Sequence, residues 1–179
     1  RDVFSHSMSG QPVIQHEWLT TVIFAFINKT FGLDGIIFLC ALIIGATIYL
    51  IYKRLRKECK TLLPVVLVAL LTLANSMVHW NARPHILSFL LLSIWMIVLN
   101  QIHKGVKNHW LFLPLIMLFW VNLHGGFIVG FITWFIYGFG VIWDIIFQKE
   151  KPCRDFPSHF WLYYSLGGIT TFLASLANP

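Results

Sequence analysis

The sequence predicts an all-α, multi-pass transmembrane helical bundle with about six spans and one interfacial amphipathic helix. Of the 179 residues, 58% are hydrophobic and only 11% are charged, whereas soluble domains have about 25% charged residues and about 45–50% apolar ones. Long apolar runs recur along the chain, and the short connections between them favour antiparallel neighbouring helices. The mean hydropathy of +0.74 agrees with this class and argues against a soluble protein.

The first apolar segment, residues 18–31, predicts a helix that lies in the membrane interface. Fourteen residues rise about 21 Å, which is too short for a hydrocarbon core of about 30 Å. Trp18 at its start and Lys29 near its end are typical of interfacial helices. The same residues could instead form the first turns of the next span, but Gly32 and Gly35 are expected to separate the two.

The next three predicted helices are spans that cover residues 35–52, 62–80 and 86–102. The first of them ends at a run of basic residues, which are costly to place in hydrocarbon. Pro64 falls in the first turn of the second span, where proline is tolerated. Arg83 precedes a proline and is therefore pushed out of the helical region, so a tight turn is expected between the second and third spans.

The last three predicted spans cover residues 110–123, 127–147 and 160–176. The fourth span is short, and a pair of glycines separates it from the fifth. The sixth ends at Asn178-Pro179, where proline cannot continue a helix. Together the six spans form a predicted membrane domain at residues 35–179, and residues 1–17 form a polar loop ahead of it.

The distribution of Lys and Arg predicts the orientation of the chain. The loops at residues 53–60, 104–109 and 148–159 carry five, two and three of these residues, which is ten of the thirteen. The positive-inside rule places these loops in the cytoplasm. We therefore expect a protein of the cytoplasmic (inner) membrane whose polar loop 1–17 lies outside. Topology accounts for the net charge of +6, so membrane lipid is an expected partner and nucleic acid is not.

Polar and ionisable residues gather on the predicted outer side. Each has a plain structural explanation, such as a helix start, an aromatic belt, a contact to lipid phosphate or a turn. Because polar groups at the ends of spans need partners or water, together they predict an outward-facing polar basin. Its members are Asp2, His6, His16, Glu17, His79, Asn81, Arg83, His85, Asn122, His124 and Asn178.

The residue types in this basin suggest catalytic roles. Asp2 or Glu17, with His16 beside it, could take a proton from an acceptor hydroxyl. Arg83, with His85 or His124, could hold a phosphate leaving group. The remaining candidates for substrate binding are His79, Asn122 and Trp18. Asp2, Glu17 and a histidine could also hold a divalent metal, although their spacing is not specific to one.

Several short motifs resemble a group of bacterial polytopic membrane proteins that is similar to the GT-C superfamily of glycosyltransferases, which use polyprenyl-phosphate-linked sugars. The motifs are Asp2-Val3-Phe4-Ser5, Gly10-Gln11-Pro12, His16-Glu17-Trp18-Leu19, Arg83-Pro84-His85, residues 122–127 and Asn178-Pro179. The resemblance implies that a membrane helix and a first acidic motif precede Arg1, and that an acidic residue of the outer loop serves as base or metal ligand.

The function expected from this resemblance is transfer of a sugar from a polyprenyl-phosphate donor to an acceptor, which the sequence does not identify, at the outer face of the membrane. The alternative is a non-catalytic transporter, lipid-binding or assembly protein. A transporter places charges and broken helices near the middle of the membrane. Here the centres of the spans are apolar apart from residues such as Asn75, which favours the enzyme.

Overall fold

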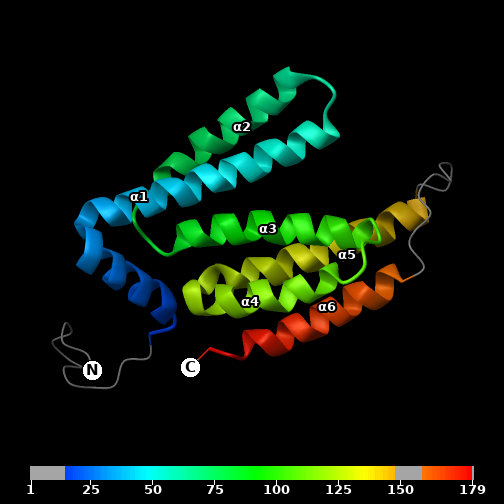
Figure 1. The fold of residues 1–179 in the computed structure, drawn as a ribbon. Coiled ribbons are helices and arrows are strands. Elements are labelled where there is room, and N and C mark those ends of the chain that lie inside the picture. Colours follow the sequence, from blue (N-terminus) through cyan, green and yellow to red (C-terminus); the bar gives the residue numbers. More distant parts are fainter. Residues whose placement is uncertain (1–14, 148–158, 179) are drawn as a thin grey trace.

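The computed structural model describes residues 15–147 and 159–178, and within them every regular element is a helix. Figure 1 shows six α-helices in antiparallel order. Their bounds are α1 Trp18–Glu58, α2 Leu62–Ser76, α3 His85–His103, α4 Phe112–Leu123, α5 Ile128–Phe147 and α6 Phe160–Ser175. Three short 3-10 turns join them: η1 Met77–His79, η2 His109–Leu111 and η3 Gly125–Phe127. The predicted all-α class is confirmed.

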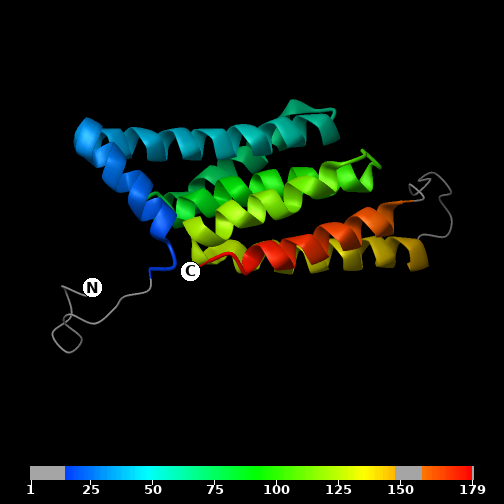
Figure 2. The same cartoon turned by 60° about the horizontal axis from the view of Figure 1, so that its bottom comes forward.

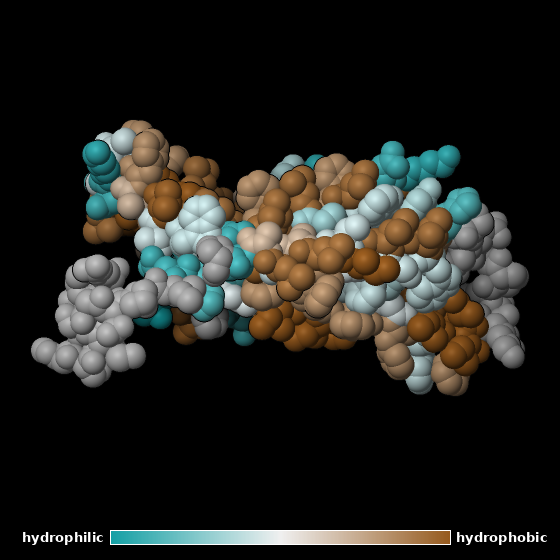
Figure 3. Space-filling model, turned by 90° about the horizontal axis from the view of Figure 1, so that it is seen from below, coloured by the Kyte–Doolittle hydropathy of each residue, from teal (hydrophilic) through white to brown (hydrophobic). Residues whose placement is uncertain are grey.

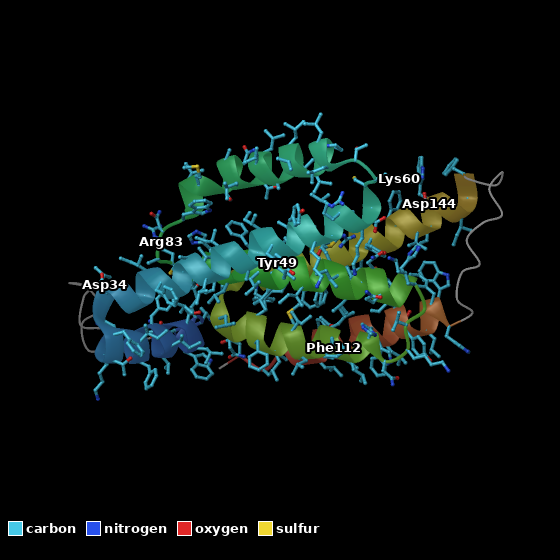
Figure 4. All side chains as sticks on the ribbon, turned by 45° about the horizontal axis from the view of Figure 1, so that its top comes forward. Asp34, Tyr49, Lys60, Arg83, Phe112 and Asp144 are labelled. Carbon is cyan, nitrogen blue, oxygen red and sulfur yellow. The ribbon has the colours of Figure 1, made fainter. Side chains whose placement is uncertain are left out.

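The alternating helices give the bundle two distinct ends. The start of α1, the α2–α3 turn, the α4–α5 turn and the end of α6 lie together, and we name this the His124 end (Figure 1). The α1–α2 and α3–α4 connections lie at the opposite end, which we name the Lys60 end. Figure 4 shows Arg83 at the first end, and Lys60 and Asp144 at the second.

A kink at Gly32 divides α1 into two parts. Gly32 has φ 66° and ψ −163°, a backbone conformation that residues with a Cβ rarely adopt. The break expected at Gly32 is therefore present, whereas the helix continues through Gly35. Residues 18–31 turn back across the His124 end, and residues 33–58 run beside α2 and α3 (Figures 1 and 2). A position of residues 18–31 in the membrane interface stays a prediction.

Among the described residues, three helical segments are long and apolar enough to cross a membrane: Trp18–Glu58, His85–His103 and Gly125–Phe147. The apolar helices Leu62–Ser76 and His109–Leu123 are shorter. At about 1.5 Å per residue, a 15-residue helix such as α2 reaches only about 23 Å of the roughly 30 Å hydrocarbon core. The chain therefore has the helices of a membrane protein, and the predicted number of six spans stays a prediction.

The core lies between α3, α4, α5 and α6. Trp95 and Trp120 are fully buried at its centre and meet edge to face, with ring centroids 6.3 Å apart, a geometry that aromatic pairs favour. Cys40, Ile43 and Ile86 form a smaller cluster that joins α1 to α3. Hydrophobic residues cover much of the middle of the face in Figure 3, and hydrophilic residues gather toward its ends.

Candidate functional site

The candidate site lies at the His124 end, where α1, α3 and the α4–α5 turn meet. His124 follows the last residue of α4 with an extended backbone, φ −161° and ψ 140°. This conformation ends the helix and directs the chain into η3. The imidazole of His124 thereby lies between the side chains of Ser88 on α3 and Glu17 at the start of α1.

Hydrogen bonds to one nitrogen of His124 determine where the ring carries its proton. The Gly126 backbone N–H donates to Nδ1 over 3.0 Å, so Nδ1 must be the acceptor. The Ser88 hydroxyl lies 2.7 Å from the same nitrogen. Since Ser88 Oγ already accepts the Trp120 indole N–H over 2.8 Å, its own hydrogen is available to donate to His124. This network assigns the imidazole proton to Nε2.

The protonated nitrogen of His124 faces a carboxylate. Nε2 lies 3.5 Å from Glu17 Oε1, and the His124 and Glu17 side chains are 25% and 38% exposed. Burial lowers the pKa of His124 below its usual value, Glu17 opposes that shift, and the nearby His85 adds to it. The imidazole is therefore neutral at pH 7, and it presents an N–H to an accessible carboxylate.

His85 and Arg83 bring further positive or donor groups to the same end. The His85 ring centroid lies 6.4 Å from that of His124 and 6.0 Å from that of Phe89. Arg83 is exposed in the turn before α3, where its backbone N–H donates to Asn81 O over 2.7 Å. The structure therefore brings Glu17, His85 and His124 together, with Arg83 two residues away from His85.

Asn122 and Trp18 have their polar atoms engaged in joining α1 to α4. The Trp18 indole N–H donates to Asn122 Oδ1 over 2.6 Å. The Asn122 amide donates to the carbonyls of Leu118, over 2.8 Å, and Ala177, over 3.2 Å. Asn122 is only 6% exposed. These contacts give both residues a positioning role, and the substrate contact expected from the sequence stays a prediction.

Two further side chains hold the end of α4. Thr20 Oγ1 donates to Leu123 O over 2.6 Å. Asn178 Nδ2 donates to Val121 O over 2.6 Å and to His16 O over 3.1 Å. The last carbonyls of a helix have no partner within it, so these bonds fix the C-terminus of α4. We name Trp18, Thr20, Asn122 and Asn178 the α4 latch.

The other predicted site residues are placed differently. His16 is exposed, and its backbone carbonyl accepts the bond from Asn178. Asp2 lies outside the described residues, and His79 is in η1 but its side chain is outside the described part of the structure. Within residues 15–147 and 159–178, no three His, Cys, Asp or Glu side chains form a group that could hold a metal ion. A metal held with the help of Asp2 stays a prediction.

Sequence reasoning missed Ser88, Trp120 and Thr20. Two spacings could have indicated the first two, because residues three or four apart share a helix face: Ser88 follows His85 by three residues, and His124 follows Trp120 by four. No comparable signal marks Thr20, whose partner lies far away in the sequence.

No protein-family model, curated protein or solved structure matches the chain.

Proposed function

We propose that the protein is a GT-C-like glycosyltransferase that moves a sugar from a polyprenyl-phosphate donor to a hydroxyl acceptor at the outer face of the cytoplasmic membrane. The observation that carries this proposal is the accessible Glu17 carboxylate beside His124, 3.5 Å from Nε2 to Oε1. General base catalysis requires a base held in position, and here a carboxylate lies beside a hydrogen-bond donor that can orient it.

In the proposed reaction, Glu17 takes the proton from the acceptor hydroxyl. The acceptor oxygen attacks the anomeric carbon of the donor, and the bond from that carbon to the phosphate oxygen breaks. Polyprenyl phosphate leaves with the bonding electrons. His124 is neutral and its N–H faces Glu17, so its proposed role is to orient the carboxylate. The proposed role of Arg83 and His85 is to bind the phosphate and stabilise the charge that develops on it, because an arginine can bind phosphate through two parallel hydrogen bonds.

An apolar cavity beside the site suits a lipid-linked donor. It has a volume of about 320 Å³ and runs between α1, α2 and α3. Ile86, one residue after His85, lines it, and so do Trp80 and Phe89. Apolar walls that begin next to the proposed phosphate contacts could accommodate the first isoprene units of the donor. The rival function, a lipid-binding protein without chemistry, would use the same cavity.

Replacement of the proposed base tests the transferase directly. We expect Glu17→Gln in the full-length protein to lower the rate of sugar release from a radiolabelled polyprenyl-phosphate sugar by about 100-fold or more, which is the typical contribution of a general base. Asp34→Asn is the matched control, because Asp34 is an exposed acid of α1 beyond the kink (Figure 4). A Glu17→Gln protein as fast as wild type would remove the base role.

A further inference from the structure

A second polar cavity lies at the Lys60 end, opposite the candidate site. It has a volume of about 260 Å³ and is formed by the last turns of α1 and α3. Lys53, Arg54, Lys57 and Lys104 line it together with a single carboxylate, Glu58. Four cations against one acid leave the wall of this cavity with a net charge of +3.

The spacing of these residues shows that two helix faces converge on the cavity. On α1 the lining positions are 50, 53, 54, 57 and 58, and on α3 they are 97, 100, 101 and 104. Both series follow the three- and four-residue spacing of one helix face. Asn100 and Gln101 therefore add amide donors opposite the cations of α1.

The cations of this cavity repel one another, and a bound anion would relieve that repulsion. Lys53 and Lys57 are four residues apart on a helix, and like charges at this spacing repel. Lys104 brings a further positive charge to the same cavity from α3. Arg54 is half-buried, and one guanidinium N–H donates to Met96 O over 2.9 Å. This bond fixes the guanidinium between the helices. An arginine has five N–H donors, and the bond to Met96 O uses one of them.

An apolar cavity adjoins the basic one. The neighbouring cavity, about 270 Å³, shares Leu50, Arg54 and Ile97 with it. Its remaining wall is mostly aliphatic and includes Leu92 and Met96. A free phosphate would use only the basic part, whereas a phospholipid would fill both parts, with its phosphate on the cations and an acyl chain along the aliphatic wall.

We propose that the cavity between the ends of α1 and α3 binds an anionic phospholipid. Both helices are long enough to cross a membrane, so their ends lie at the depth of the headgroups. Basic cavities between membrane helices are typical binding sites for anionic headgroups. The headgroup part of the site is independent of the proposed transferase chemistry, because it lies at the other end of the bundle and shares no lining residue with the donor cavity. The aliphatic part shares Ile51, Leu92 and Ser93 with that cavity.

The test compares two double variants that lose the same charge. Arg54→Gln/Lys57→Gln removes two cations from the cavity wall, and Arg56→Gln/Lys60→Gln removes two from the same basic run outside that wall as the structure describes it. Binding of dioleoylphosphatidylglycerol and dioleoylphosphatidylcholine to the purified full chain in detergent is measured by native mass spectrometry. Each contacting cation contributes about a fivefold gain in affinity for an anionic lipid. We therefore expect the first variant to bind phosphatidylglycerol at least about tenfold more weakly than wild type. The affinity of the second variant should stay within about twofold of wild type.

Three outcomes would overturn the proposal. An equal loss of affinity for phosphatidylglycerol in both double variants would indicate general electrostatic attraction to the basic surface and no specific site. Equal binding of the two lipids by wild-type protein would remove the preference for an anionic headgroup, and this comparison needs no variant to fold. Displacement of the bound lipid by sn-glycerol 3-phosphate at comparable concentration would assign the cavity to a soluble phosphate compound.

Discussion

At the scale of single residues, the state of His124 follows from the groups around it. Nδ1 accepts a hydrogen bond from the Gly126 backbone N–H over 3.0 Å. A backbone N–H cannot become an acceptor, so a proton added to Nδ1 would face another proton and break this bond. Burial acts in the same direction on the pKa of His124, and the charge of Glu17 only partly opposes it.

A dependence of stability on pH follows from this environment. The fold lowers the pKa of His124 below its usual 6.5, so on acidification the unfolded chain binds this proton first. The contribution to the free energy of unfolding is complete above about pH 6.5 and is lost as pH falls through the lower pKa of the folded state. Between about pH 7.5 and about pH 5, we expect the unfolding temperature of wild-type protein in detergent to fall further than that of His124→Gln.

The control for this measurement is His109→Gln at the Lys60 end. It removes a histidine that is not enclosed by the site, since His109 Nδ1 is within 3.4 Å of the exposed Lys107 carbonyl. The unfolding temperature of His109→Gln should fall on acidification by as much as that of wild type. An unfolding temperature of His124→Gln that falls as steeply as that of wild type would contradict a lowered pKa of His124 in the folded protein.

At the scale of elements, the α4 latch decides how the site is assembled. Glu17 reaches His124 only because residues 18–31 turn back from the kink at Gly32 and are tied to the end of α4. Trp18 and Thr20 make these ties through the Asn122 side chain and the Leu123 carbonyl. Asn178, which follows α6, donates to the Val121 carbonyl in the last turn of α4, and Figure 2 shows the segment after α6 beside the start of α1.

Removal of the amide at the centre of the α4 latch should destabilise the protein. Asn122→Ala leaves the Trp18 indole N–H without its acceptor and takes away a donor to Ala177 O, both in part-buried hydrogen bonds. A hydrogen bond of this kind contributes about 0.5–1.5 kcal/mol to stability. We expect a lower unfolding temperature in detergent and faster amide exchange at residues 18–31. Asn75→Ala is the matched control, since the amide of the exposed Asn75 donates to Leu71 O within its own helix. Equal effects of the two variants would contradict the role of the latch.

The sequence predicted the helices and the break at Gly32, but it did not predict the latch. Apolar runs and glycine carry local signals, because burial and backbone freedom depend on the residue itself. The partners of Asn122 are set by long-range packing: its bond to Trp18 joins residues 104 positions apart. For the same reason the sequence did not indicate the bond between Asn122 and Trp18 or the position of Ser88 beside His124.

At the scale of the whole molecule, the two ends of the bundle differ in chemistry. The His124 end holds His85, His124, Glu17 and the α4 latch, and the Lys60 end holds the basic cavity of α1 and α3. Between them, large apolar side chains such as Phe135 and Phe139 are 65% and 64% exposed on α5. Exposed apolar surface of this kind suits contact with lipid tails.

The difference between the ends predicts an orientation that labelling can measure. Arg83 lies at the His124 end and Arg56 in the basic run at the Lys60 end. The positive-inside rule places the basic run in the cytoplasm. In a full-length protein whose native cysteines are replaced by serine, we expect a membrane-impermeant maleimide added outside intact cells to label Arg83→Cys and not Arg56→Cys. Permeabilised cells, in which both positions should react, provide the control for expression and folding. Labelling of Arg56→Cys alone in intact cells would reverse the orientation and place Glu17 and His124 on the cytoplasmic side, where an outward-facing transferase could not work.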